Sequence, residues 1–141
     1  MNVLFFLTPK HDVAYISDTS SVRQALEKME HHGYTAVPIL DSNGKYIGIL
    51  TEGDLLRAIK NDYNMDLKAA EQITIASLKR QNRFSESVTL NTNIEDLIET
   101  SLNQNFVPVT TEDGIFMGIV TRKAIIKYFY EKHNEHAERA I

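Results

Sequence analysis

The chain repeats itself. The stretch "GILTEGDLLRA", Gly48 to Ala58, returns as "GIVTRKAIIKY", Gly118 to Tyr128, at an offset of 70 positions. The pair Val37-Pro38 returns at the same offset as Val107-Pro108. Because an internal repeat at this scale marks a duplicated structural unit, it constrains the fold more than any other feature.

The two copies differ in length. The helical pattern ahead of them is offset by 72 positions and pairs Val22, Ala25 and Leu26 with Ile94, Leu97 and Ile98. The second copy therefore lacks two residues, which we expect to be missing between Asn105 and Val107.

Each copy predicts the same order of elements, β-α-β-β-α. We expect a short extended segment, an amphipathic helix, two strands joined by a Gly-containing turn, and a final helix. In the first copy the extended segment is 14–16, the first helix starts near Ser20, the strands are 35–40 and 46–50, and the last helix follows Thr51. In the second copy the extended segment is 88–90, the first helix starts near Thr92, the strands are 106–110 and 116–120, and the last helix follows Thr121. Thr92 and Glu95 have the spacing of a capping box.

Neither half buries much apolar surface alone, because each has only roughly 55 to 60 residues. We therefore predict an α+β fold of two repeats packed sheet to sheet with pseudo-two-fold symmetry. The predicted division is 1–62 for the first repeat with its lead-in, 63–85 for a connecting segment and 86–141 for the second repeat with the C-terminal helix. A short helix over 66–72 is expected in the connection, and Ile73, Ile75 and Leu78 are expected to pack on the core.

Composition excludes several classes of protein. The formal net charge of -4 argues against a broad nucleic-acid surface. The chain has no cysteine, which excludes disulfide and thiolate chemistry. Since no apolar run has the length of a membrane span and the early run from Val3 to Leu7 is short, we expect a cytoplasmic protein.

Two helix starts carry polar groups that could hold a ligand. Thr51 and Asp54 have capping-box spacing, which common helix caps alone would explain. At the equivalent place the second copy has Arg122, Lys123 and Ala124. Cations in a first turn oppose the helix dipole, whereas a bound anion would make them favourable. Phosphate binding, a solvated basic pair and a salt bridge to a neighbouring acid therefore all remain open.

The repeats resemble a tandem pair of CBS domains, the regulatory modules named after cystathionine β-synthase. The segments "YTAVPILDSNGKYIGILTEGDLL" and "FVPVTTEDGIFMGIVTRKAII" carry the resemblance, which covers nearly the whole chain. It implies a stand-alone module that binds adenine nucleotides between its repeats and forms homodimers. It further implies that Thr51 and Asp54 contact a ribose, a role that Ala124 cannot take in the second copy.

Among such modules, the chain is similar to stand-alone CBS pairs that bind cyclic di-AMP in Gram-positive bacteria. The "GYTAVP" strand, the "GIVTRK" segment and the Val13-Ala14 dipeptide carry this similarity. It implies an adenine stacked on Tyr34 or Phe106. The complete predicted ligand site is Ala14, Tyr34, Thr35, Ala36, Thr51, Asp54, Phe106, Thr121, Arg122 and Lys123. The intact Thr51–Asp54 motif favours AMP, ADP or ATP instead.

Three functions stay open at this point. The favoured function is a nucleotide sensor that signals to a partner protein. A structural dimerisation module without a ligand is the second. An enzyme is not expected, because there is no nucleophile elbow, no Gly-rich phosphate loop and no clustered histidine chemistry. His133 and His136 have a spacing that can bind a metal, but nothing fixes a third ligand, so neither a metal nor a cofactor is predicted.

Overall fold

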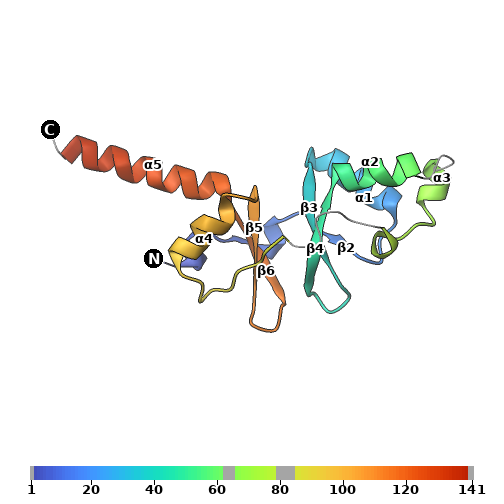
Figure 1. The fold of residues 1–141 in the computed structure, drawn as a ribbon, viewed down its shortest axis with the longest axis horizontal. Coiled ribbons are helices and arrows are strands. Elements are labelled where there is room, and N and C mark those ends of the chain that lie inside the picture. The colour runs from blue at the N-terminus through green and yellow to red at the C-terminus, as the bar shows by residue number, and fades with distance from the viewer. Residues whose placement is uncertain (1, 62–65, 79–84, 140–141) are drawn as a thin grey trace. The chain divides into compact units, whose positions relative to one another are not determined.

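A computed structural model describes residues 2–61, 66–78 and 85–139 (Figure 1). These residues form two compact units, each with a three-stranded sheet and its own apolar core. The repeat-1 unit consists of Ala14–Ser85 with Gly114–Phe116. The repeat-2 unit consists of Met1–Val13, Glu86–Asp113 and Met117–Ile141. The predicted α+β class is confirmed.

The repeat-1 unit has the order strand, helix, strand, strand, helix. Its main elements are β2 (Ile16–Ser17), α1 (Val22–His32), β3 (Ala36–Leu40), β4 (Tyr46–Thr51) and α2 (Glu52–Asn61). In the sheet β2 pairs parallel with β3, and β3 pairs antiparallel with β4. The order of these elements agrees with the sequence analysis.

The connecting segment packs on this unit. It contains α3 (Leu67–Ala70), whose N-terminus is capped by Asp66, and the 3-10 helix η3 (Ile75–Ser77). Ile75 is fully buried in the core with Ile39 and Leu50. The predicted contacts of this segment with the core are confirmed. Two parts of the predicted connection, 63–65 and 79–84, lie outside the described residues.

The repeat-2 unit is built around α4 (Ile94–Ser101), β5 (Phe106–Thr110), β6 (Phe116–Thr121) and α5 (Arg122–Arg139). Its sheet has the order β1-β6-β5, where β1 is Thr8–Pro9 near the N-terminus. The extended segment expected at 88–90 is reduced to a parallel bridge between Val88 and Val109.

The N-terminal lead-in belongs structurally to the repeat-2 unit. Thr8 and Pro9 pair antiparallel with Ile119 and Gly118. Val3 and Phe6, on the 3-10 helix η1 (Val3–Phe6), are buried in the same core as Val107 and Val120. A second 3-10 helix, η2 (Lys10–Asp12), leads out of this unit. The predicted division places this lead-in with the first repeat, whereas its contacts are with the second.

The expected place of the missing residues is wrong. The Arg122 amide donates to the Asn105 carbonyl at 2.9 Å, as the Glu52 amide does to the Thr35 carbonyl at 3.0 Å. Asn105 is therefore the equivalent of Thr35, so the two copies are already offset by 70 positions at this point. The two residues are missing earlier, because α1 runs 11 residues to a Gly33 cap while α4 ends after 8 residues at Ser101.

The helix caps also differ from the expected ones by one residue. Ser21 and Gln24 form a complete capping box at the start of α1. The α4 N-cap is Asn93, whose side chain accepts from the Asp96 amide at 2.8 Å. Thr92 instead accepts from the Thr89 amide, so the predicted Thr92–Glu95 box does not form. Ser21 is of the same residue type as the expected Ser20, and Asn is preferred over Thr as an N-cap, so residue type does not favour the expected starts.

Helix α5 continues beyond its own unit's core. Ile125 is buried and Tyr128 is half-buried, but every residue from Phe129 to His136 is exposed. Figure 1 shows the red end of α5 running past the elements of its unit. None of the helices in the described ranges combines the length and the apolarity that crossing a membrane requires.

Candidate functional site

The start of α2 is held by a closed set of hydrogen bonds. The Asp54 carboxylate accepts from the Thr51 amide at 2.9 Å and from the Thr51 hydroxyl at 3.0 Å through Oδ2. The Thr51 hydroxyl in turn accepts from the Asp54 amide at 3.1 Å. This is the capping box that the spacing predicts.

Asp54 has a further partner that the sequence analysis missed. The Arg57 guanidinium donates to Asp54 Oδ1 at 2.7 Å, one helical turn further on. The Asp54 side chain has no exposed area, whereas that of Arg57 is 36% exposed. The i,i+3 spacing of an acid and an arginine was the available signal. A ribose reaching Asp54 would share the carboxylate with Arg57.

The start of α5 has a capping threonine, as α2 does, but has no acidic residue where α2 has Asp54. The Thr121 hydroxyl accepts from the Ala124 amide at 3.0 Å, as Thr51 does from Asp54. Ala124 offers no oxygen, so the reciprocal bond and the acidic partner are both absent at this position. The second copy thus has half of the capping box.

Arg122 is fixed by the end of α4. Its Nε donates to the Ser101 carbonyl at 2.8 Å, and Nη2 donates to the Leu102 carbonyl at 3.3 Å. The last carbonyls of a helix lack intrahelical partners, and a cation there also suits the helix dipole. Arg122 therefore caps α4 where Gly33 caps α1. Lys123 beside it is exposed.

The segment before β3 presents the other predicted residues. Tyr34 and Thr35 are exposed and Ala36 is half-buried. The Tyr34 ring stacks on His32, with centroids 5.4 Å apart and planes 7° apart. One face of Tyr34 is thus covered by a neighbour on its own chain. Ala14, at the start of the same unit, is half-buried.

Six of the ten predicted residues lie in the repeat-1 unit and four in the repeat-2 unit. The four are Phe106, Thr121, Arg122 and Lys123. Within each unit the structure brings the capping Thr beside the first turn of the helix that follows. That both sets line one cleft stays a prediction, as do the ligand roles of the individual residues.

Metal ligands do not gather in the part of the chain that the structure describes. There, no group of three or more histidine or acidic side chains is placed to hold an ion. His133 and His136 are both exposed on α5.

The comparisons with known proteins place the chain in a family. The model of the CBS domain matches residues 6–61 and 83–131. The chain is 24% identical over 122 residues to the cyclic di-AMP receptor B of Bacillus subtilis, a match that covers 86% of this chain and 82% of that protein.

Solved structures share the fold. A crystal structure of CbpB in complex with c-di-AMP superposes with a TM-score of 0.86 at 21% identity, over 99% of this chain and 91% of that one. The crystal structure of CBSX2 in complex with AMP has a TM-score of 0.73 at 24% identity, over 94% and 98% of the two chains. Two repeats with the family's fold and a family match over both of them lead to one conclusion: this chain belongs to the CBS domain family as a tandem pair.

Proposed function

We propose that this CBS pair is a regulatory module that binds an adenine nucleotide, with cyclic di-AMP as the favoured ligand. One observation carries the choice of ligand. Where the first repeat starts its last helix with Glu52 and the buried Asp54, the second starts with Arg122, Lys123 and Ala124. At this helix N-terminus the second repeat has two cations where the first repeat has two carboxylates.

The chemistry of cyclic di-AMP fits this exchange. Its two phosphodiesters are anionic, and a helix N-terminus with two cations favours an anion. Its 3′,5′ linkage leaves one free hydroxyl on each ribose, so an acid that accepts from two ribose hydroxyls is not required. Arg122 supports this role because the bonds of Nε and Nη2 to the α4 carbonyls fix the guanidinium in place.

Relatives support the same ligand class. The Bacillus subtilis relative is named as a cyclic di-AMP receptor, and the CbpB structure was solved with c-di-AMP. The CBSX2 structure was solved with AMP, which keeps a mononucleotide sensor as the second candidate. The intact Thr51–Asp54 motif favours this candidate, although Arg57 already occupies Asp54 Oδ1.

Thermal unfolding with AMP, ADP, ATP, cyclic di-AMP and GTP tests the proposal, followed by calorimetry for each ligand that stabilises the protein. A ligand that binds only the folded state adds about 2.7 kcal/mol of stability at a hundredfold excess over its Kd. We expect stabilisation by cyclic di-AMP.

Substitutions then locate the site. Lys123→Ala removes an exposed cation and is expected to weaken cyclic di-AMP binding by about tenfold, whereas Lys68→Ala on α3 is the matched control. Stabilisation by AMP or ATP alone, lost in Asp54→Asn, would favour the mononucleotide sensor. No stabilisation by any of the five would contradict both.

The ligand would act by shifting a population. A nucleotide can favour one state of the module only by its differential affinity for the two states. We propose that a partner protein in the cytoplasm reads this shift, and that the module regulates rather than catalyses. The homodimer expected from the family resemblance is part of this proposal.

A further inference from the structure

Helix α1 ends in a cluster of stacked rings. Its last two residues are His31 and His32, and Gly33 ends the helix in the left-handed conformation, with a φ of 68°. The Tyr34 amide then donates to the Met29 carbonyl at 3.1 Å. Glycine adopts this conformation without a steric penalty, and the reversal of the chain brings the Tyr34 side chain back beside the end of the helix.

The rings of Tyr34 and His32 lie face to face. Their centroids are 5.4 Å apart and their planes differ by 7°, a parallel and offset arrangement that aromatic rings favour. The His31 ring packs edge-on against His32, with centroids 5.0 Å apart and an interplanar angle of 81°. His32 therefore contacts both rings. Tyr34 is still 47% exposed, so it keeps ring surface that a planar ligand can reach.

The second repeat has no counterpart of this stack at the same position. At the offset of 70, Gln104 takes the place of Tyr34. Leu102 takes the place of His32. The Gln104 side chain donates to the Phe106 carbonyl at 3.2 Å, so it binds backbone instead of presenting a ring. Of the two equivalent segments, only the one in the first repeat offers an aromatic surface built from stacked side chains.

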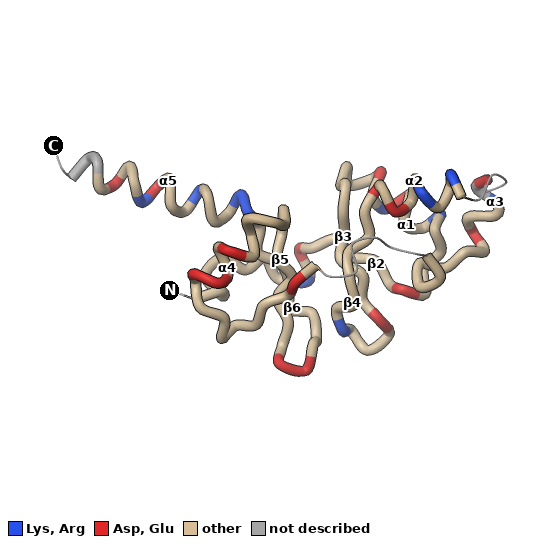
Figure 2. The backbone as a smooth tube through the Cα atoms, viewed as in Figure 1, with Lys and Arg blue, Asp and Glu red and all other residues tan. Residues whose placement is uncertain are grey.

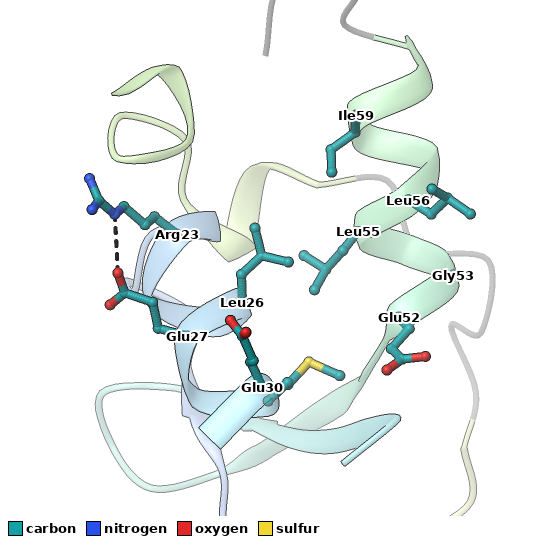
Figure 3. Close-up of a pocket in the computed structure, with 10 residues that line it drawn as sticks. Arg23, Leu26, Glu27, Glu30, Glu52, Gly53, Leu55, Leu56 and Ile59 are labelled. Carbon is teal, nitrogen blue, oxygen red and sulfur yellow. Dashed lines mark hydrogen bonds and ion pairs between the residues drawn. The ribbon is translucent and has the colours of Figure 1, made fainter. Parts of the chain in front are cut away.

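The surroundings of the stack favour an uncharged group of a ligand. Glu30 lies in the last turn of α1, and Glu52 begins α2, where its amide donates to the Thr35 carbonyl at 3.0 Å. Both glutamates line a pocket between α1 and α2 (Figure 3). Figure 2 marks acidic residues at the start of α2 and basic residues at the start of α5. A neutral, planar nucleobase suits the stack, whereas neighbouring acids disfavour a phosphate there.

We propose that His32 is a positioning residue for the base: it holds the Tyr34 ring in the orientation on which the adenine of the nucleotide stacks. This inference rests on the proposed function and adds to it a residue outside the predicted ligand site. A ring that is fixed before binding loses less conformational entropy when the base arrives, so its support raises affinity without contact to the ligand. His31, packed on His32, supports the same arrangement.

NMR of the protein without nucleotide tests the support itself. A ring stacked on an imidazole experiences its ring current, so the Tyr34 ring protons are expected to lie upfield of those of an isolated tyrosine. His32→Ala is expected to move them back downfield, whereas His32→Phe keeps a flat ring and is expected to keep the upfield shift. Tyr34→Leu assigns the signals. Tyr34 signals that stay unchanged in His32→Ala would overturn the proposal, whatever nucleotide the protein binds.

Calorimetry with cyclic di-AMP tests the consequence for binding. His32→Ala is expected to weaken binding by about threefold to tenfold, the equivalent of one aromatic contact. His32→Phe is expected to bind within about twofold of wild type, because the flat ring restores the stack. The matched control is His133→Ala, which removes an exposed histidine from α5 and is expected to bind as wild type does.

The outcomes separate this inference from the proposed function. Equal affinity of wild type and His32→Ala would overturn the positioning role and leave nucleotide binding intact. A loss in His32→Ala that His32→Phe does not restore would also overturn it, because a flat ring would then not be the property that matters. If only AMP binds, the same comparison is made with AMP. A wild-type protein that binds neither nucleotide would contradict the proposed function and this inference together.

Discussion

At the scale of single residues, Asp54 is the polar side chain whose loss we expect to destabilise the protein. It is buried and accepts hydrogen bonds from Thr51 and Arg57. Asp54→Ala is expected to lower the free energy of unfolding by about 2 to 3 kcal/mol, since it removes a cap and leaves buried donors unpaired. Urea denaturation measures this. Glu52→Ala, an exposed acid on the same turn, is the control, and an equal loss in both variants would contradict the role of the box.

Ala124 offers the reverse experiment. The Thr121 hydroxyl already caps the Ala124 amide, so Ala124→Asp supplies the missing half of the box and a charge that suits the helix dipole. Stability is expected to rise by about 0.5 to 1 kcal/mol in urea denaturation. A decrease would show that the half-buried site at Ala124 cannot take a carboxylate.

At the scale of the elements, the pairing of β1 with β6 depends on Gly118. A Cβ atom at this position would meet the Thr8 carbonyl oxygen, and the residue has a φ of 153°. Gly118→Ala is expected to lower the free energy of unfolding by about 3 kcal/mol, because the Thr8 carbonyl oxygen belongs to the backbone and cannot move aside as a flexible side chain would. Gly53→Ala in α2, whose nearest neighbour is the flexible Arg57 side chain, is expected to be neutral or stabilising by up to ~1 kcal/mol. Thermal unfolding of both variants checks the opposite signs.

At the scale of the whole molecule, the N-terminus is tied to the second repeat. Phe6 is buried with Val107 and Val120 and lies edge-on to Tyr128, with ring centroids 5.4 Å apart. Phe6→Ala is expected to cost about 3 kcal/mol through lost burial and a cavity. Amide NMR signals of β5 and α5 should shift, while those of α1 and β3 should not. Shifts confined to the repeat-1 unit would contradict this assignment.

Features that depend on residues a few positions apart were predictable. The Thr51–Asp54 box, the strand over 106–110 and the α+β class were predictable from local pattern, because hydrogen bonds across one helical turn and a short apolar run bounded by turn residues are both local. The place of the missing residues was misjudged because an alignment within one chain cannot tell a shortened helix from a shortened loop.

The sequence by itself determined that the chain is a duplicated α+β module and that Thr51 and Thr121 precede its two repeated helices. Only the tertiary structure decided which distant parts of the chain those residues contact. The sequence left Arg122 open to an anion, to solvent or to a neighbouring acid, whereas the structure shows it capping α4 through carbonyls about 20 positions away. Every residue carries a backbone carbonyl, so residue types do not reveal such a contact. The lead-in pairs with Ile119, more than a hundred residues away. Such contacts follow from packing, which spacing along the chain does not encode.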